Sequence, residues 1–270
     1  MSDFRADLHC HSNCSDGTDS PIELLHLAKK EGLSGLSITD HDTLAAYTKE
    51  FFSEAKKLEL EILVGVEFSA DHRGHSVHIL GYGVDPESEA MQKLQKHHLM
   101  RRAKRNQAIL DKLAKKGFPI DPLPKEGVVG RPHIAQKMVE KGYVKDISEA
   151  FQNYLGDGKS CYIVLDPVSV EKTVAAIHEA GGKAFIAHPH LHSSAKFVKE
   201  LLKFPFDGLE CYYGNFFPHH ERRWLQLAES KNLLVSGGSD YHGAIKPRSS
   251  LGSSWVDNAT FVKIRPHEFY

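Results

Sequence analysis

Short apolar runs alternate with amphipathic segments along most of the chain, and this alternation predicts repeated strand–helix units. Seven runs are predicted to be strands: residues 6–11, 33–39, 61–68, 76–82, 183–187, 208–212 and 233–237. Helices are predicted between most of them, at residues 20–32, 43–58, 169–180, 194–203 and 219–230. Repeated units of this kind imply parallel strands with right-handed crossovers. We therefore expect an α/β fold, a distorted (β/α)7 barrel of the TIM type.

The middle of the chain breaks this rhythm. Residues 89–116 are predicted to form one long helix, and two short helices are expected at 132–141 and 147–154, after a loop. The sequence thus predicts two domains. A barrel would comprise residues 1–89 and 166–270, and a small helical insertion, residues 90–165, would bind substrate.

Composition narrows the class of protein. The chain has 270 residues, of which 41% are hydrophobic, and this suits one large domain with a small insertion. It has no apolar run of roughly 18 residues, so we expect no membrane-spanning helix. Its first ten residues lack an apolar signal segment, which favours the cytoplasm. A net charge of −1 gives no broad attraction for long nucleic acid.

Four cysteines in a chain of this length do not predict a disulfide framework. They are Cys10, Cys14, Cys161 and Cys211. We expect free thiols, because soft ligands are unusual where carboxylates and imidazoles already crowd a metal site. The sequence leaves the role of Cys10 and Cys14 open.

Nine histidine and acidic side chains follow the predicted strands, mostly at their carboxyl ends. They are His9, His11, Asp16, His41, Glu67, His78, His188, Asp240 and His242. Parallel barrels collect their chemistry at these ends, so the nine side chains are expected to meet. Burying so many ionisable groups without cations would be costly, and bound metal is the economical explanation.

Each of these residues alone has an ordinary explanation. His9 and His11 could be a polar pair, and Asp40 with His41 could form a turn or cap a helix. Glu67 could belong to a structural ion pair, and His78 could be a satisfied strand residue. Their recurrence after strand upon strand is what favours a metal site.

The donor types limit the metal and the reaction. Mixed imidazole and carboxylate sites suit Mn, Zn or Fe, whereas sites made only of oxygen suit Mg or Ca. Nine ligands are too many for one ion, so two or three divalent ions are expected. Clustered ions of this kind suit hydrolysis, because they ionise a water near neutral pH and clamp the oxygens of a phosphoryl group.

Several motifs together resemble the PHP (polymerase and histidinol phosphatase) family. They are Asp7-Leu8-His9-Cys10-His11-Ser12, Ser15-Asp16-Gly17, Thr39-Asp40-His41-Asp42, Gly65-Val66-Glu67, His188-Pro189 and Gly238-Ser239-Asp240-Tyr241-His242. The resemblance covers almost the whole chain. It implies a distorted seven-stranded barrel with a trinuclear metal site. Cys10 departs from the family, which usually has a small hydroxyl residue there.

The resemblance also implies how the nine ligands divide among three ions. The first would be held by His9, His11, Glu67 and Asp240. Glu67 would bridge to a second, which His78 and His188 complete. The third would be held by Asp16, His41 and His242.

The insertion resembles the YciV/TrpH-like branch, which removes phosphate from nucleoside 3′,5′-bisphosphates and trims 5′ ends of short RNA. Residues 93–116 carry nine lysines and arginines against one acid, which could also be no more than a solvated basic helix. Arg102 and Arg105 share one helical face, and with Arg131 they could clamp a second phosphate. Asn106 is a further candidate. His133 could donate to phosphate or only cap its helix.

These observations predict a metal-dependent phosphoesterase for small nucleotides and short 5′-phosphorylated oligoribonucleotides, acting without a membrane. A metal-activated hydroxide would attack phosphorus, with Mn²⁺ favoured over Zn²⁺ or Fe²⁺. Asp40 would orient one of the metal ligands without binding the metal itself. A histidinol-phosphate phosphatase is an alternative, although its cationic substrate has little use for arginines. An amidohydrolase and a non-catalytic regulatory module are others. The oligomeric state stays open.

Overall fold

The computed structural model describes residues 4–123, 127–192, 194–214, 216 and 218–266, which form a mixed α/β fold. The chain divides into two compact units. Met1–Gln95 and Val168–Tyr270 form the first, here called the sheet unit, and Lys96–Pro167 form the second, the helical unit. The two domains expected from the sequence, with boundaries near residues 89 and 166, stay a prediction. The substrate-binding role of the insertion stays a prediction.

Eight strands among the described residues form two sheets. The strands are β1 (Ala6–Cys10), β2 (Gly35–Ile38), β3 (Glu61–Ile62), β4 (Gly65–His72), β5 (His75–Tyr82), β6 (Lys183–Ile186), β7 (Gly208–Tyr213) and β8 (Leu234–Gly238). One sheet has the order β1-β2-β3 and the other the order β4-β5-β6-β7-β8. The third predicted strand, residues 61–68, is therefore wrong in extent, since it is split between β3 and β4.

Strand β5 runs antiparallel to both of its neighbours, β4 and β6. The other pairings are parallel, as expected for strands joined by helices, and β5 departs from the all-parallel order of a regular (β/α)7 barrel. The cause is the link between β4 and β5, which consists of Arg73 and Gly74 alone, with φ of 54° and 81°. Two positive φ values make a type I′ turn, and a two-residue link can join only antiparallel strands.

The regular pairing of the described strands does not close into one barrel. Single parallel bridges nevertheless link the two sheets. Cys10 on the edge strand β1 pairs with Tyr241 after β8, and His41, which follows the central strand β2, pairs with Glu67 on β4. The closed seven-stranded barrel therefore stays a prediction.

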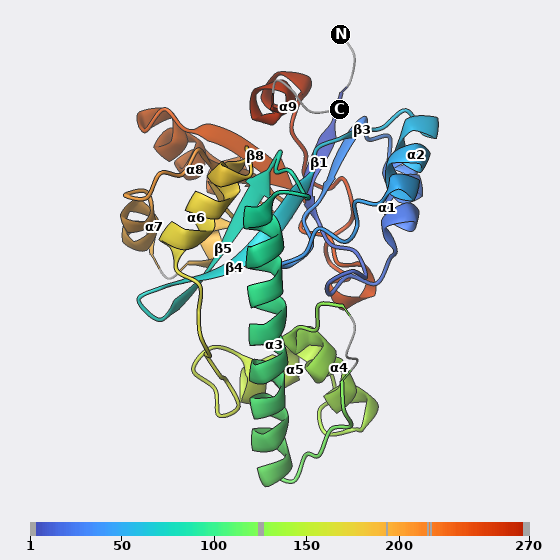
Figure 1. Cartoon of the computed structure of the whole chain (residues 1–270), viewed down its shortest axis with the longest axis vertical. Helices are drawn as coiled ribbons and strands as arrows, with labels where there is room; N and C mark the ends of the chain where they lie inside the picture. Colours follow the sequence, from blue (N-terminus) through green and yellow to red (C-terminus); the bar gives the residue numbers. More distant parts are fainter. Residues whose placement is uncertain (1–3, 124–126, 193, 215, 217, 267–270) are drawn as a thin grey trace. The chain divides into compact units, whose positions relative to one another are not determined.

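Helices cover the outer faces of the two sheets. In the sheet unit these are α1 (Pro21–Lys30), α2 (Lys49–Lys57), α6 (Val170–Glu179), α7 (Ala195–Leu201) and α8 (Pro218–Ser230). A further helix, α9 (Asn258–Ile264), packs with Leu8, Tyr82 and Phe185. Figure 1 shows α1 and α2 side by side along the smaller sheet, and α6, α7 and α8 along the larger one. Apolar residues such as Leu24, Leu36 and Phe51 fill the space beneath α1 and α2.

Helix α2 begins six residues later than the sequence predicts. Thr48 caps it, because its side chain accepts from the Phe51 N–H. The preceding residues are held away from helical geometry by Tyr47, whose hydroxyl donates to the Ile38 carbonyl (2.6 Å) and accepts from the Gly65 N–H (2.8 Å). Tyr47 thereby ties β2 to β4, close to the point where the two sheets meet.

The helical unit has an apolar core of its own. Helix α3 (Glu89–Lys115) runs from the sheet unit into it, and the unit also contains α4 (Arg131–Glu140), α5 (Ile147–Ala150) and a π-helical turn at Phe151–Leu155. Ile109 and Leu113 of α3 pack with Ile134 and Met138 of α4. None of the described helices is long and apolar enough to cross a bilayer.

Asp7 fastens β1 to the end of β8 and to the loop beyond it. Its buried carboxylate accepts from the backbone N–H groups of His9 (3.2 Å), Ser239 (3.0 Å) and Gly252 (2.8 Å). The two strands approach so closely that a Cβ on Gly238 would lie 2.3 Å from the His9 nitrogen. This contact sets the spacing between His9 and the residues that follow β8.

We expect Asp7→Ala to lower the free energy of unfolding by roughly 3 kcal/mol or more, because it strands three buried N–H groups at about 1–3 kcal/mol each. Asp257 is a matched control, since it caps the exposed start of α9 and its loss should cost about 1 kcal/mol. Urea unfolding of both variants measures the difference. Equal losses would contradict the anchoring role of Asp7.

Candidate metal centre

The nine side chains singled out by the sequence lie in one connected cluster in the sheet unit. His9 is on β1, Glu67 on β4 and His78 on β5, while the others follow β1, β2, β6 or β8. Glu67 stands in the first half of β4 rather than at a strand end, because the β4–β5 hairpin extends well beyond it.

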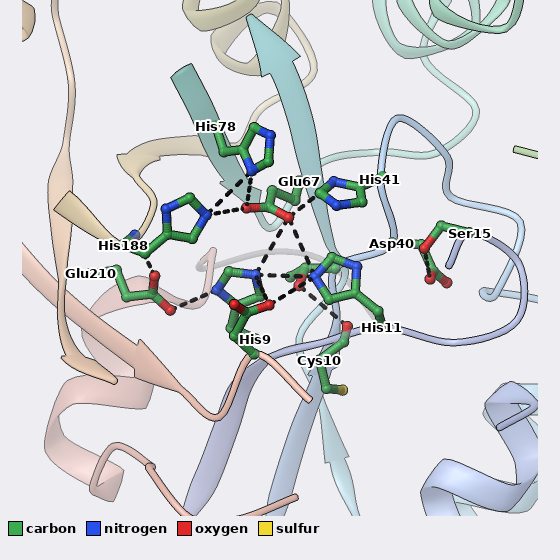
Figure 2. Close-up of polar contacts among 12 residues, drawn as sticks. His9, Cys10, His11, Ser15, Asp40, His41, Glu67, His78, His188 and Glu210 are labelled. Atoms are coloured by element: carbon green, nitrogen blue, oxygen red, sulfur yellow. Dashed lines mark hydrogen bonds and ion pairs between the residues drawn. The ribbon is translucent and has the colours of Figure 1, made fainter. Parts of the chain in front are cut away.

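Glu67 lies at the centre of the cluster. Figure 2 shows its carboxylate between the imidazoles of His9, His11, His41, His78 and His188. The side chain is 1% exposed. Five imidazoles therefore surround this buried carboxylate at distances of 3.5 Å or less.

Four donor atoms form the first group: Nε2 of His9, Nε2 of His11, Oε2 of Glu67 and Oδ1 of Asp240. Five distances among them lie between 3.2 and 3.5 Å. His9, His11 and Glu67 form a triangle with edges of 3.2–3.5 Å, which an ion can bind at about 2.1 Å from each corner, the length of Zn–N and Zn–O bonds. The spacing of these donors therefore fits one ion bound between them.

The second group contains the other oxygen of Glu67. Its Oε1 lies 3.0 Å from Nδ1 of His78 and 2.9 Å from Nε2 of His188, and these two nitrogens are 3.3 Å apart. Each oxygen of Glu67 thus belongs to a different group, as a carboxylate does when it bridges two ions.

The third group gathers around Asp16, which lies in the turn after β1. Its carboxylate lies 3.7 Å from Nε2 of His41, 3.5 Å from Nε2 of His242 and 3.8 Å from Nδ1 of His11. Donor atoms of these four residues all lie within 4.8 Å of one another. They are too far apart for strong hydrogen bonds but close enough to share a cation.

Unpaired nitrogens support the same interpretation. Among the described residues, Nδ1 of His11 and Nδ1 of His41 are buried and have no hydrogen-bond partner. The His41 nitrogen lies 3.0 Å from Oε2 of Glu67 and is nevertheless not aligned to bond with it. Buried polar atoms rarely lack a partner, so these two nitrogens are available to accept from a further group or to bind a cation.

The electrostatics of the cluster also call for positive charge. Burial alone would lower the pKa of His11, but Asp240, Glu67 and Asp16 outweigh it and raise the pKa to about 9. The pKa of His9 is likewise held well above its usual range, against burial, by Glu210, Glu67 and Asp240. Without metal, protons on these imidazoles balance the buried carboxylates.

The pKa values of two other imidazoles are lowered instead of raised. Burial lowers the pKa of His41 to about 3 and that of His242 to about 4. Both rings are therefore neutral at pH 7, and a neutral imidazole is the form that binds metal.

The backbone is unusual where the ligands leave their strands. Asp42, His188 and Asp240 adopt positive φ values of 57°, 27° and 51°. Residues other than glycine rarely hold this conformation, and such strain concentrates at functional sites. It turns the side chains that follow β6 and β8 toward the cluster.

Asp40 holds the loop that carries Asp16. It accepts from the Ser12 N–H (2.8 Å) and from the hydroxyls of Ser12 and Ser15 (2.5 Å each). Its carboxylate is 1% exposed, and burial raises its pKa to about 6. Asp40 thus holds the loop in place, and its charge also interacts with that of His11.

Glu210 on β7 is a functional candidate that the sequence analysis missed. It is fully buried, and its Oε1 lies 2.7 Å from Nδ1 of His9. Its Oε2 accepts from the His188 N–H at 2.6 Å. Carboxylates behind metal-binding histidines fix the ring orientation and raise ligand basicity. The available signal was one charged residue in the otherwise uncharged run Gly208–Tyr213.

The cysteines are free, as predicted. Cys10 is buried, and its thiol donates to the Ser37 carbonyl. Figure 2 shows its sulfur pointing away from the imidazoles. Cys10 therefore supports the strand between two ligands and is not placed to bind metal itself.

The arginines of the helical unit lie in two different surroundings. Arg102 and Asn106 are buried on α3 and line a pocket of about 280 Å³. Arg105 donates to Oδ1 of Asn106, whose amide nitrogen donates to the Val129 carbonyl (2.8 Å). This chain of contacts fixes the loop that leads into α4.

Arg131 is engaged in the packing of the helical unit. It donates to the Leu155 carbonyl (3.1 Å) and to Asp157 (3.0 Å), and it lies over the ring of Tyr162. His133 accepts from the Gly130 N–H (2.9 Å) and so caps its own helix, one of the two roles left open by the sequence. Phosphate binding by these residues stays a prediction.

Relatives that match most of the chain have names that describe hydrolysis of phosphate esters. The chain is 35% identical over 245 residues to the 5′-3′ exoribonuclease of Haemophilus influenzae, covering 87% of this chain and 89% of that protein. It is 31% identical over 247 residues to the 3′,5′-nucleoside bisphosphate phosphatase of Chromobacterium violaceum, covering 87% and 86%. The chain is therefore a metal-dependent phosphoesterase, a hydrolase acting on phosphate esters.

Residues 7–156 match the PHP domain, and the chain belongs to the PHP domain family. Solved structures agree. A structure from Bifidobacterium adolescentis described as a metal-dependent phosphoesterase has a TM-score of 0.85 and 32% identity, covering 96% of this chain and 94% of that one. A Chromobacterium violaceum structure described as an amidohydrolase with bound sulfate and no metal has a TM-score of 0.83 and 28% identity, covering 97% and 93%. The resemblance to the bisphosphatase and exoribonuclease branch is confirmed.

Metal affinity should rise with pH. Because the pKa of His11 is about 9 without metal, an ion must displace at least one proton at pH 7. We expect the Mn²⁺ affinity to increase about tenfold per pH unit between pH 6 and 8 for each proton displaced. Calorimetry in two buffers of different ionisation enthalpy counts the protons released. An affinity independent of pH would contradict the proposed role of His11.

Glu210→Gln should weaken Mn²⁺ binding by roughly 10–100-fold. The amide keeps an acceptor for His9, but it removes the charge and turns an N–H toward the His188 N–H. Chelator competition measures the affinity, with exposed Glu229→Gln on α8 as the control. Unchanged Mn²⁺ affinity in a folded Glu210→Gln protein would show that this carboxylate does not support the ligands.

Proposed function

We propose that the chain hydrolyses phosphate from nucleoside 3′,5′-bisphosphates and from the 5′ ends of short oligoribonucleotides. The reaction would take place at a trinuclear site formed by the nine side chains of the cluster. The observation that carries this proposal is the division of Glu67 between two groups of donors, with a third group around Asp16. Single bridges that link the two sheets support a strongly distorted barrel as the frame.

The ions would be held as the donor groups suggest. His9, His11, Glu67 and Asp240 would hold the first. Glu67, His78 and His188 would hold the second, and Asp16, His41 and His242 the third. The mixture of nitrogen and oxygen donors suits Mn²⁺, with Zn²⁺ or Fe²⁺ as alternatives.

Divalent ions in such a cluster supply Lewis-acid chemistry: they lower the pKa of a water molecule and neutralise charge on the phosphoryl oxygens. The protein's own residues have to keep the donors in place. Asp40 holds the loop of Asp16, and Glu210 orients His9 and the backbone of His188. These contacts keep the donors in one arrangement before substrate binds, so little reorganisation accompanies the reaction.

The helical unit would bind the part of the substrate that does not react. Arg102 and Asn106 line the pocket on α3, and Arg105 donates to Oδ1 of Asn106. Guanidinium groups match phosphate oxygens in pairs, so a second phosphate would hold the nucleotide in one orientation. Arg131 and His133 would contribute mainly by fixing the shape of this unit, as their contacts indicate.

A binding site for a second phosphate favours the proposed substrate over that of the alternative enzymes. Histidinol phosphate carries a cationic amine and has no second phosphate for these arginines to bind. The nine-donor cluster includes Asp16 and His41, which an amidohydrolase site that starts from a pair of histidines on one strand would not need.

Phosphate release should be fastest from adenosine 3′,5′-bisphosphate and short 5′-phosphorylated RNA, and slow from histidinol phosphate, each measured with Mn²⁺. His41→Ala should reduce turnover of every substrate at least 100-fold, about the effect of losing an essential metal ligand. Equal rates for adenosine 3′,5′-bisphosphate and histidinol phosphate would contradict the proposed specificity.

Arg105→Ala tests the second-phosphate site separately. We expect it to raise KM for the bisphosphate roughly tenfold while leaving the rate with a simple monophosphate unchanged. The matched control is Lys104→Ala, which removes an exposed cation from the same helix. Equal KM effects of the two variants would show that total charge, rather than Arg105, matters.

A further inference from the structure

The two oxygens of Asp240 face different partners. Oδ1 points to the donor cluster, 3.5 Å from Nε2 of His9 and 3.4 Å from Nε2 of His11. Oδ2 accepts a hydrogen bond from the Tyr213 hydroxyl at 2.6 Å and contacts the ammonium group of Lys246. Neither Tyr213 nor Lys246 belongs to the nine donors, so both need an explanation of their own.

Lys246 combines a fixed backbone with a partly exposed end. Its N–H donates to the Gly243 carbonyl (3.2 Å) and its carbonyl accepts from the Ser249 N–H (3.0 Å). The loop is further tied down by Ala244, whose N–H donates to the Thr18 hydroxyl (3.1 Å). The side chain is 39% exposed, and its ammonium group lies 2.9 Å from the Tyr213 oxygen.

An ammonium group beside a metal ligand is poorly placed once cations bind. An ion at Oδ1 of Asp240 would withdraw charge from the carboxylate and repel Lys246 across it. The Tyr213 hydroxyl can satisfy Oδ2 alone, because it already donates to it. The lysine, with its flexible stem and exposed end, is then free to bind a different anion nearby.

We propose that Lys246 is a phosphate-binding residue of the active site. When substrate binds, its ammonium group moves from Asp240 to a non-bridging oxygen of the phosphoryl group that is released. Tyr213 is a positioning residue that keeps Oδ1 of Asp240 aimed at the cluster when the lysine moves. This inference rests on the proposed metal site but not on nucleotide specificity. It applies to any phosphate monoester that the cluster accepts.

A simpler role is possible for the same contacts: Lys246 could serve only to orient Asp240. The two roles predict different consequences of losing the charge. If Lys246 only orients Asp240, its loss should weaken metal binding. If Lys246 binds phosphate, its loss should leave metal affinity unchanged or higher and should weaken phosphate binding.

The test compares wild-type protein with Lys246→Met, Lys246→Arg and Lys231→Met, a control that removes an exposed lysine in the turn after α8. Three quantities are measured for each folded protein. They are Mn²⁺ affinity by chelator competition, affinity of the Mn²⁺-loaded protein for inorganic phosphate by calorimetry, and kcat/KM for p-nitrophenyl phosphate.

We expect Lys246→Met to bind Mn²⁺ as tightly as wild type or more tightly. Its phosphate affinity and kcat/KM should fall roughly 10–100-fold, as for the loss of a hydrogen bond between charged groups. Lys246→Arg should recover much of the phosphate affinity, and Lys231→Met should match wild type.

Weaker Mn²⁺ binding by Lys246→Met, with phosphate affinity restored at saturating Mn²⁺, would overturn the proposal in favour of an orienting role. Unchanged phosphate affinity would overturn it as well. Because neither probe is a nucleotide, a failure of the nucleotide specificity proposed above would leave these results readable.

Discussion

The buried carboxylate of Glu67 is the constraint on which the rest of the site depends. A charged oxygen pair removed from water is costly unless cations or hydrogen-bond donors compensate it. Here the compensation comes from imidazoles on four different strands or strand ends, so the folded chain has to bring those strands together around one point. The pKa of Glu67 is held well below its usual range in spite of burial, first by His78 and His41. The cluster is therefore organised for positive charge before any ion is considered.

Groups around the cluster then restrict its geometry. Asp7 sets the distance between β1 and the residues after β8, Asp40 fixes the turn of Asp16, and Glu210 fixes the ring of His9. All three are buried carboxylates that accept from backbone or side-chain donors. These three carboxylates are not themselves among the proposed metal ligands, but they hold the ligand side chains in position. Each of these buried acids thus has a role in positioning the metal ligands.

Much of this site could be predicted from the sequence because strand periodicity is local. The alternation in His9-Cys10-His11 places both imidazoles on one face. Asp40-His41 after β2 and Asp240-Tyr241-His242 after β8 indicate further ligands in the same way. Glu210 could not be recognised in the same way, since its partner His9 is 201 residues away and a single acid in a strand has many explanations. The antiparallel course of β5 depends on two residues, Arg73 and Gly74, whose positive φ values are not encoded in a hydrophobic pattern. Arg131 illustrates a third limit, because composition indicates a basic surface but not which arginine is committed to an acid within its own unit.

Anomalous X-ray diffraction from crystals of the Mn²⁺-loaded protein tests the central claim most directly. The account predicts three anomalous peaks inside the cluster: one between His9, His11 and Asp240, one beside His78 and His188, and one beside Asp16. Glu67 should touch the first two, one with each oxygen. Peaks that lie outside the cluster, or a Glu67 carboxylate that contacts no ion, would contradict the claim that burial of this residue organises a metal site.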